Sequence, residues 1–321
     1  MAFAEAKTID RNTIPVIDIA PLRDGTGAAE VAGQLHAASQ ELGFIYITGH
    51  GIPEDLIEIA RARAYEFFRA DPGEKEAVRV SDRHRGWIGP GGAKMQDNAK
   101  PDLKESFIWG WQDADSATPE DHPLRGRNQW PAFLPSFEAN AMAYFHAAHE
   151  VAHHMMRGFA LGLGLAPDFF LRTADRPLSR ASFVYYPAQP EDLGPARFGV
   201  GPHTDFGVLT VLCQDDVGGL QVQDRDGDWV HAPPIPGSLI VNVADLLSRW
   251  TAGAFKSTPH RVVNTSGRER LSLVLAYDPN PETEIDPSEV YGREVEGAEA
   301  PIICGDYLIW RFGKAFAYRK G

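Results

Sequence analysis

The stretch His203-Thr-Asp-Phe-Gly-Val-Leu-Thr-Val-Leu212 places two potential metal ligands directly before an apolar run that is typical of a buried strand. His203 and Asp205 are two residues apart, so their side chains project to the same side of an extended backbone. His260 begins a second strand-like run, His-Arg-Val-Val263. Two imidazoles and one carboxylate can cap one face of an octahedral ferrous ion and leave positions open for a chelating co-substrate and dioxygen. We therefore expect iron(II) on these three side chains.

Short β-rich runs continue on both sides of this stretch, from Ser179 onward. Clusters of Gly, Pro or Asp separate most of them, and the runs are 181–186, 207–213, 219–223, 228–232, 238–243, 259–264 and 270–277. Many short strands separated by such turn residues indicate a sandwich or jelly roll. The fold class that we predict is mainly β, with a jelly-roll core.

The first half of the chain has a different pattern, in which helices predominate. Apolar spacing and turn residues predict strands at 14–19 and 44–48 and helices at 31–42, 53–70 and 137–159. The segment from Ser81 to about Asp121 has weak periodicity, and we interpret it as a long ordered excursion.

We expect four segments along the chain. An N-terminal mixed α/β segment that packs on the core is followed by a long helical segment, the jelly-roll core, and a C-terminal part that packs on the outside of that core. Their bounds are 1–125, 126–175, 176–280 and 281–321. The last of them is predicted to contain an apolar strand at 301–304 and an aromatic tail at 307–318.

The predicted strand at 270–277 alternates in a way that suggests a second ligand. Arg270 and Ser272 face one side together with Val274 and Ala276, and the intervening leucines face the other side. Burying an unpaired guanidinium is costly, whereas a guanidinium beside a hydroxyl can hold a carboxylate. Because this pair follows His260 closely, we interpret it as a clamp for a 2-oxo acid rather than as a solvated sheet edge.

The composition narrows the class of ligand. The chain has 321 residues, 43% of them hydrophobic, and a net charge of −13. An acidic chain is poorly suited to neutralise the phosphates of nucleic acid or to bind an anionic membrane surface. A small molecule is therefore the expected partner, with no nucleic acid and no membrane involved, and the oligomeric state stays open.

Cysteine usage and the N-terminus suggest a reducing compartment. Cys213 and Cys304 are far apart and lie in apolar surroundings, so we expect two buried thiols rather than a disulfide framework. The stretch from Met1 to Lys7 lacks the basic and apolar regions of a secretion signal. We expect a cytoplasmic protein, which also suits ferrous iron.

A rival metal motif occurs at His149-Glu-Val-Ala-His153, which fits the H-E-x-x-H pattern of zinc proteases. These residues share a polar stripe with His146 and Arg157, opposite the apolar stripe of the same predicted helix. The chain lacks the glycine and third histidine of the longer protease pattern. We interpret the stripe as a solvated or interdomain helix face.

Several motifs together resemble a known family. In order and spacing, His203-Thr-Asp205, His260-Arg-Val262 and Arg270-Leu-Ser272 are similar to the catalytic half of the isopenicillin-N-synthase-like iron(II)/2-oxoglutarate-dependent dioxygenases. The resemblance covers nearly the whole chain, and its further stretches are Ile14–Asp18, Gly43–Pro53, Pro101–Phe107, Tyr185–Pro187, Gly218–Val222 and Asn242–Asp245.

The resemblance implies a double-stranded β-helix as the core, flanked by N-terminal and central helices. It implies that His203, Asp205 and His260 bind iron, and that Arg270 and Ser272 hold the distal carboxylate of 2-oxoglutarate. It also implies that Tyr186 contacts the co-substrate or supports the site.

The activity implied is the hydroxylation or desaturation of a small molecule, in which dioxygen is consumed and succinate and carbon dioxide are released. An iron oxidase or an ethylene-forming enzyme on this fold, and a non-catalytic ligand-binding module, remain alternatives. The aromatic residues that we expect to contact a substrate are Trp87, Trp109, Trp111, Phe206 and Trp250.

Overall fold

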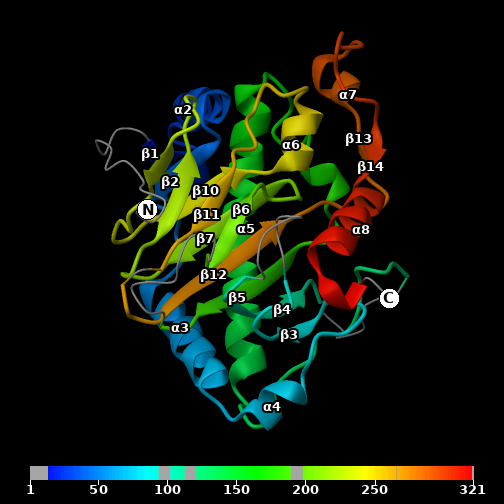
Figure 1. Ribbon diagram of the computed structural model, residues 1–321. Coiled ribbons are helices and arrows are strands. Elements are labelled where there is room, and N and C mark those ends of the chain that lie inside the picture. Colours follow the sequence, from blue (N-terminus) through cyan, green and yellow to red (C-terminus); the bar gives the residue numbers. More distant parts are fainter. Residues whose placement is uncertain (1–13, 94–101, 113–120, 189–197, 265, 320–321) are drawn as a thin grey trace.

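An eight-stranded sheet combines strands from both halves of the chain (Figure 1). The computed structural model describes residues 14–93, 102–112, 121–188, 198–264 and 266–319, so the N-terminal stretch from Met1 to Lys7 lies outside the described residues. The strand order is β1-β2-β10-β7-β12-β5-β4-β3. The strands are β1 (Val16–Asp18), β2 (Phe44–Thr48), β3 (Gly86–Ile88), β4 (Glu105–Gly110), β5 (Arg180–Tyr186), β7 (Leu209–Gln214), β10 (Leu239–Val243) and β12 (Arg270–Tyr277).

A four-stranded sheet, in the order β6-β11-β8-β9, packs over the larger one and completes a jelly-roll sandwich. Its strands are β6 (Val200–His203), β8 (Leu220–Gln223), β9 (Trp229–His231) and β11 (His260–Val262), and a separate pair consists of β13 (Glu284–Ile285) and β14 (Ile302–Ile303). Apolar side chains from both sheets fill the space between them, among them Phe44, Val184, Val222 and Ile240. The mainly β jelly-roll prediction is therefore confirmed.

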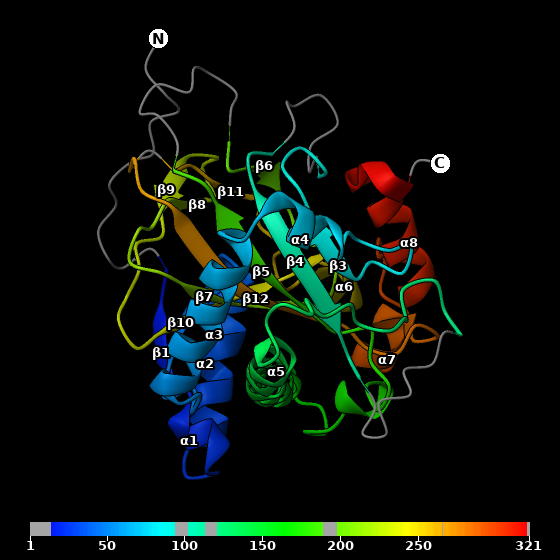
Figure 2. The same cartoon turned by 90° about the horizontal axis from the view of Figure 1, so that it is seen from below.

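Helices cover the outer face of the large sheet (Figure 2). They are α1 (Ala20–Arg23), α2 (Ala28–Glu41), α3 (Glu54–Phe68) and the long α5 (Phe137–Gly162). The other helices lie elsewhere and are α4 (Pro72–Glu76), α6 (Asp245–Trp250), α7 (Pro287–Tyr291) and the peripheral α8 (Cys304–Ala315). Short 3₁₀ turns occur at Leu171–Thr173 and Ala317–Arg319. The apolar stripe of α5 packs on β7 and β12, while α2 and α3 pack on α5. This amphipathic packing confirms the long helix that the sequence predicts.

Gly43 allows the chain to turn from α2 directly into β2. Its φ is +69°, and a Cβ atom there would lie 1.8 Å from the backbone oxygen of Lys256. An L side chain would therefore meet both backbone strain and a clash. This agrees with the predicted helix at 31–42, which ends at the residue before Gly43.

The structure differs from the sequence predictions in three parts of the chain. The 81–121 segment is not only an excursion, because it contributes β3 and β4 to the large sheet; β4 is buried on both faces and so shows no alternation. The strand β6 was not predicted, since Gly201 and Pro202 disfavour strands. The aromatic tail at 307–318 is largely the helix α8, on which Leu308 and Phe312 recur at helical spacing.

Two negative expectations concern membranes and disulfides. Within the described ranges, no helix is both long and apolar enough to cross a bilayer. Cys213 and Cys304 are free and buried, as expected from their apolar surroundings.

Candidate functional site

The three expected metal ligands converge at one edge of the sandwich. His203 ends β6 and His260 begins β11, and these strands pair in antiparallel register with the two histidines opposite each other. The Nε2 atoms of both histidines lie 3.8 Å from Oδ1 of Asp205. One ligand atom from each residue falls within a cluster 4.8 Å across, which is the one such cluster found among the described residues. Since ligand nitrogen and oxygen atoms bind divalent cations at about 2 Å, this spread fits one ion.

Backbone carbonyls orient both imidazole rings. The Nδ1 atom of His203 lies 2.8 Å from the carbonyl of Gly201, and that of His260 lies 3.2 Å from the carbonyl of Thr258. A carbonyl only accepts hydrogen bonds, so each Nδ1 carries the proton. The lone pair of each Nε2 atom is thereby left for a metal.

The carboxylate of Asp205 is oriented in the same manner. Its Oδ2 atom accepts hydrogen bonds from Thr210 Oγ1 at 2.6 Å and from Asn242 Nδ2 at 2.8 Å. Oδ1, the atom that faces the two imidazoles, keeps its lone pairs for a cation. The backbone oxygen of Asp205 also accepts a bond from the amide of Asp245, which fixes the loop.

The protonation states suit a cation. Burial, and then the neighbouring His260, lower the pKa of His203 to about 3. Burial alone would raise the pKa of Asp205, but His260, His203 and the hydrogen bonds from Asn242 and Thr210 lower it to about 2. At neutral pH the site therefore holds a neutral His203 beside an ionised carboxylate, which are the forms that bind metal.

We expect Asn242→Leu to weaken divalent cation binding by about 10- to 100-fold, the usual effect of removing a hydrogen bond that orients a ligand. The leucine keeps most of the side-chain volume but leaves Oδ2 of Asp205 with one donor. Titration with manganese(II) measures the change in affinity. Unchanged affinity in a folded Asn242→Leu protein would show that Thr210 alone orients the carboxylate.

A second binding position surrounds Arg270, which is fully buried on β12. Its Nε atom donates to the carbonyl of Gly218 at 2.5 Å, and its guanidinium lies 4.7 Å from the centre of the Tyr186 ring. Within the described parts of the chain, neither terminal nitrogen of Arg270 has a hydrogen-bond partner, and neither does Oγ of Ser272 nearby. Buried polar groups are rarely left unsatisfied, so these three donors indicate that a carboxylate binds there.

A cavity of about 180 Å³ connects the two positions. As the alternation of β12 predicts, Arg270 and Ser272 face into it. The described residues of its lining contain three cations, Lys104, Arg180 and Arg270, and one carboxylate, that of Asp205. Arg180 is paired with the buried carboxylate of Asp278, so Lys104 and Arg270 are the cations left for ligands. The cavity is therefore suited to more than one negative group.

The aromatic residues of the cavity differ in part from those expected. Phe206 lines it, as predicted, together with Phe312, Phe316 and His84. Trp87, Trp109 and Trp250 are buried elsewhere in the core, and Trp111 packs against α5, so the expectation for these four tryptophans is wrong. The C-terminal helix α8 thus supplies part of the cavity wall instead of only covering the core.

The His149-Glu-Val-Ala-His153 motif forms no metal cluster in the part of the chain that the structure describes. Glu150 is exposed and lies near His153 and His154 rather than near His149. Of the two expected settings, a solvated or an interdomain face, the solvated one is wrong for His149, which is 4% exposed and forms a hydrogen bond with Ser179 of the core segment. Burial lowers its pKa to about 3, so it acts as a neutral core residue.

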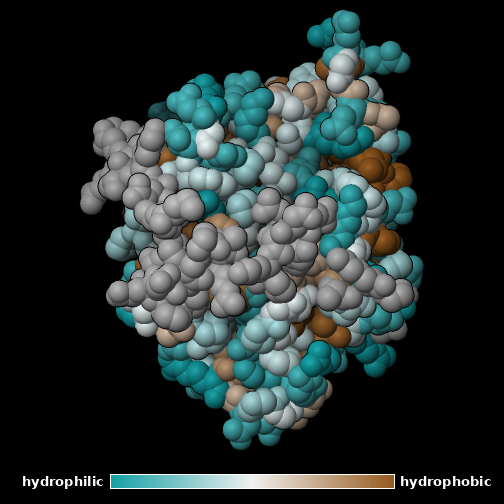
Figure 3. Space-filling view, in the orientation of Figure 1, coloured by the Kyte–Doolittle hydropathy of each residue, from teal (hydrophilic) through white to brown (hydrophobic). Residues whose placement is uncertain are grey.

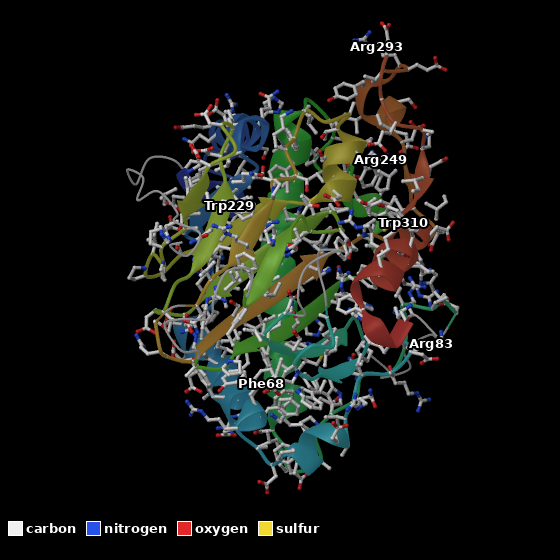
Figure 4. The ribbon with its side chains drawn as sticks, viewed as in Figure 1. Phe68, Arg83, Trp229, Arg249, Arg293 and Trp310 are labelled. Carbon is white, nitrogen blue, oxygen red and sulfur yellow. The ribbon has the colours of Figure 1, made fainter. Side chains whose placement is uncertain are left out.

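Asp245 connects α6 and α8 to the loop that carries His203 and Asp205, which we call the ligand loop. Its carboxylate accepts bonds from Thr204, Ser257 and Tyr307 and pairs with Arg311 at 2.8 Å. A separate hollow lies between these helices. Its lining includes Arg249 and Trp310 (Figure 4).

The surface beside this hollow is partly apolar. Hydrophobic residues gather near β14 and α8 in the space-filling view (Figure 3), where Trp310 is 53% exposed. The hollow offers no cluster of metal ligands among the described residues, so it is distinct from the candidate metal site.

Some site residues could not be identified from the sequence. Asn242 and Asp245 lie in a motif that marks the family, but their contacts with the ligand loop follow only from the packing of β10 and α6. Lys104, His84 and Thr210 have no signal of their own, because single polar residues in strands and loops are usually solvated.

Comparison with family models and curated proteins agrees along most of the chain. Residues 14–133 match the model described as non-haem dioxygenase in morphine synthesis N-terminal, and residues 179–279 match the 2OG-Fe(II) oxygenase superfamily. A homoarginine-6-hydroxylase of Glycine max is 33% identical over 90% of this chain and 92% of its own. A 2-oxoglutarate-Fe(II) type oxidoreductase of Emericella nidulans is 34% identical over 95% and 92%.

The fold is also similar to that of solved structures. A full-length Neurospora crassa protein crystallised with α-ketoglutarate superposes with a TM-score of 0.85 at 29% identity, covering 96% of this chain and all of that one. The same protein has been crystallised with thymine as well, and that complex superposes with a TM-score of 0.84.

Proposed function

Because the chain belongs to the iron(II)/2-oxoglutarate-dependent dioxygenases, we propose that His203, Asp205 and His260 hold its iron and that Arg270 and Ser272 hold its 2-oxoglutarate. The enzyme oxidises a small molecule with dioxygen and releases succinate and carbon dioxide. Tyr186, whose ring lies under the guanidinium of Arg270, positions that guanidinium.

The single observation that carries this assignment is the set of unsatisfied groups in one cavity. The lone pairs of two Nε2 atoms and of Asp205 Oδ1 converge, and the terminal nitrogens of Arg270 and Oγ of Ser272 lack partners. A cation at the first position and a dicarboxylate reaching the second satisfy all of them together.

When bound, iron and 2-oxoglutarate supply the oxidising power for breaking a substrate C–H bond. The residues of this chain hold the metal ligands in position and exclude water from the cavity. Thr210 and Asn242 keep Asp205 in place, and the carbonyls of Gly201 and Thr258 keep the imidazoles aimed at the cation. Phe206, Phe312 and Phe316 line the cavity with apolar surface, which limits access of water to the reacting centre.

We expect oxygen consumption by the iron-loaded enzyme to require 2-oxoglutarate and to stop when iron is chelated. Each molecule of oxygen consumed should be matched by one of succinate, and iron(II) added after chelation should restore both. An oxygen electrode combined with succinate analysis measures the two quantities.

The remaining alternatives give different results in this experiment. Oxygen uptake without 2-oxoglutarate would indicate an iron oxidase on this fold. No uptake and no succinate under any condition would indicate a non-catalytic binding module. Ethylene in the headspace would indicate the ethylene-forming reaction.

A compact substrate is supported by the lining of the cavity, which extends beyond Arg270 and the metal ligands to Lys104, Phe312 and Phe316. Homoarginine and thymine, from the names of similar proteins, are therefore reasonable first compounds. The described lining offers no carboxylate besides Asp205 for a guanidinium group. We therefore expect homoarginine to stimulate succinate formation poorly, and efficient turnover of it would contradict this.

A further inference from the structure

Lys104 points into the cavity because its neighbour is held on the opposite side of the strand. Oε2 of Glu105 accepts hydrogen bonds from Lys75 Nζ and Trp87 Nε1, both at 2.8 Å, in the protein core. Successive residues of a strand face opposite sides, so this network turns Lys104 and Ser106 towards the cavity that they line. The orientation of the lysine is thus set by buried contacts.

Among the residues that the structure describes, the ammonium group of Lys104 has no hydrogen-bond or ion-pair partner, although Lys104 lines the same cavity as His203 and Asp205. The carboxylates of Asp102 and Asp205 have other contacts: Asp102 Oδ1 accepts from the amide of Gly201 at 3.1 Å, and Asp205 accepts from Thr210 and Asn242. Burial lowers the pKa of Lys104 below its ordinary value, and the two aspartates oppose this shift. An ammonium placed there is suited to an anion that enters the cavity.

An anion bound by Lys104 would be distinct from the distal carboxylate of the co-substrate. Arg270 lies on β12, opposite Tyr186 of β5, and Lys104 directly precedes β4 on the far side of β5. Two strand spacings, about 10 Å, therefore separate the two backbones. The terminal nitrogens of Arg270 with Ser272 already match one carboxylate.

We propose that Lys104 binds the carboxylate of an anionic substrate beside the metal, so that the enzyme prefers small monocarboxylic acids with an apolar body. The inference rests on the proposed function. The apolar body lies against the wall formed by Ile108, Phe206, Phe312 and Phe316, which line the same cavity. Because Lys104 lines the same cavity as His203 and Asp205, this proposal places the oxidised carbon near the carboxylate of the substrate.

The test compares acids with their neutral counterparts on the full-length enzyme loaded with iron(II) and 2-oxoglutarate. The probes are phenylacetate, 3-phenylpropionate, cyclohexanecarboxylate and octanoate, each with its primary amide, which has similar shape but no charge. Dissociation constants are measured without oxygen, and succinate formation is measured with oxygen. The variants are Lys104→Met, Lys104→Arg and, as a surface control, Lys256→Met.

The wild type should bind at least one acid about 10- to 100-fold more tightly than its amide, the usual effect of a charge-assisted hydrogen bond. Lys104→Met should lose this preference by weakening the acid only, with the dissociation constant of 2-oxoglutarate unchanged. Lys104→Arg should keep part of the preference, and Lys256→Met all of it.

Three results would overturn the proposal. One is a wild type in which no acid outbinds its amide. Another is a Lys104→Met enzyme that weakens only 2-oxoglutarate, which would place the lysine at the co-substrate. The last is equal weakening of acids and amides in both Lys104→Met and Asp102→Asn, which would indicate an ion pair with Asp102 that only supports the fold. Failure of the proposed function is distinguishable, because the wild type would then show no oxygen uptake that depends on 2-oxoglutarate.

Discussion

Asp205→Ala is expected to lower substrate-dependent succinate formation by more than about 100-fold, which exceeds the usual effect of removing only an orienting partner of a metal ligand. The substitution removes the one carboxylate in the ligand cluster and leaves two imidazoles, which bind a ferrous ion less well than the full set. The donors Thr210 and Asn242 also lose their acceptor. Iron content after anaerobic loading and succinate formation are the two measurements.

The matched control for this variant is Asp226→Ala, since Asp226 is exposed at a turn remote from the cavity. It should keep iron and activity. If Asp205→Ala formed succinate at the wild-type rate with a full complement of iron, the assignment of the metal site would be wrong. Loss of activity with full iron retention would instead give Asp205 a role in the reaction other than holding the metal.

Arg270→Met is expected to raise the KM for 2-oxoglutarate by about 100-fold or more, because two charge-assisted hydrogen bonds of about 1.5–3 kcal/mol each are lost. The same substitution should leave the ligand-free protein as stable as the wild type or more stable. The guanidinium is fully buried with two unsatisfied nitrogens, and apolar replacements of buried charges often stabilise proteins by about 1–4 kcal/mol. Initial rates and thermal unfolding of the apoprotein measure the two effects.

The stabilisation of the folded protein by its ligands is a further test of the role of Arg270. Manganese(II) with 2-oxoglutarate should raise the melting temperature of the wild type, since a ligand that binds only the folded state stabilises it, but should have little effect on Arg270→Met. Arg268→Met serves as the control, because Arg268 pairs with Asp216 at the surface. A variant that unfolds more easily without ligands and keeps a normal KM would show that Arg270 supports the fold alone.

The fold class could be predicted because the strands of the core are short, punctuated and in part alternating. The arrangement of the first half could not be predicted to the same depth. β4 is buried on both faces, so its residues show no period of two that would mark a strand. β6 carries Gly201 and Pro202, which mask it, and yet it positions His203.

The candidate site also contains residues that could be predicted from the sequence and residues that could not. His203, Asp205 and His260 could be grouped from residue type and spacing, and Arg270 with Ser272 from the alternation of one strand. Lys104, His84, Phe312 and Phe316 could not, because the cavity brings them together from segments more than two hundred residues apart. Side chains that meet only through tertiary packing leave no local pattern in the sequence.

The position of α8 after the metal ligands in the sequence has a consequence for synthesis. Domains form from the N-terminus as the chain leaves the ribosome, and the ligands at 203, 205 and 260 precede Phe312 and Phe316. A chain that stops before α8 would carry its metal and co-substrate ligands but lack one wall of the cavity and the contacts of Tyr307 and Arg311 with Asp245. Such a truncated product would consume oxygen and 2-oxoglutarate without retaining a substrate to oxidise, so incomplete translation would yield a wasteful enzyme rather than an inert one.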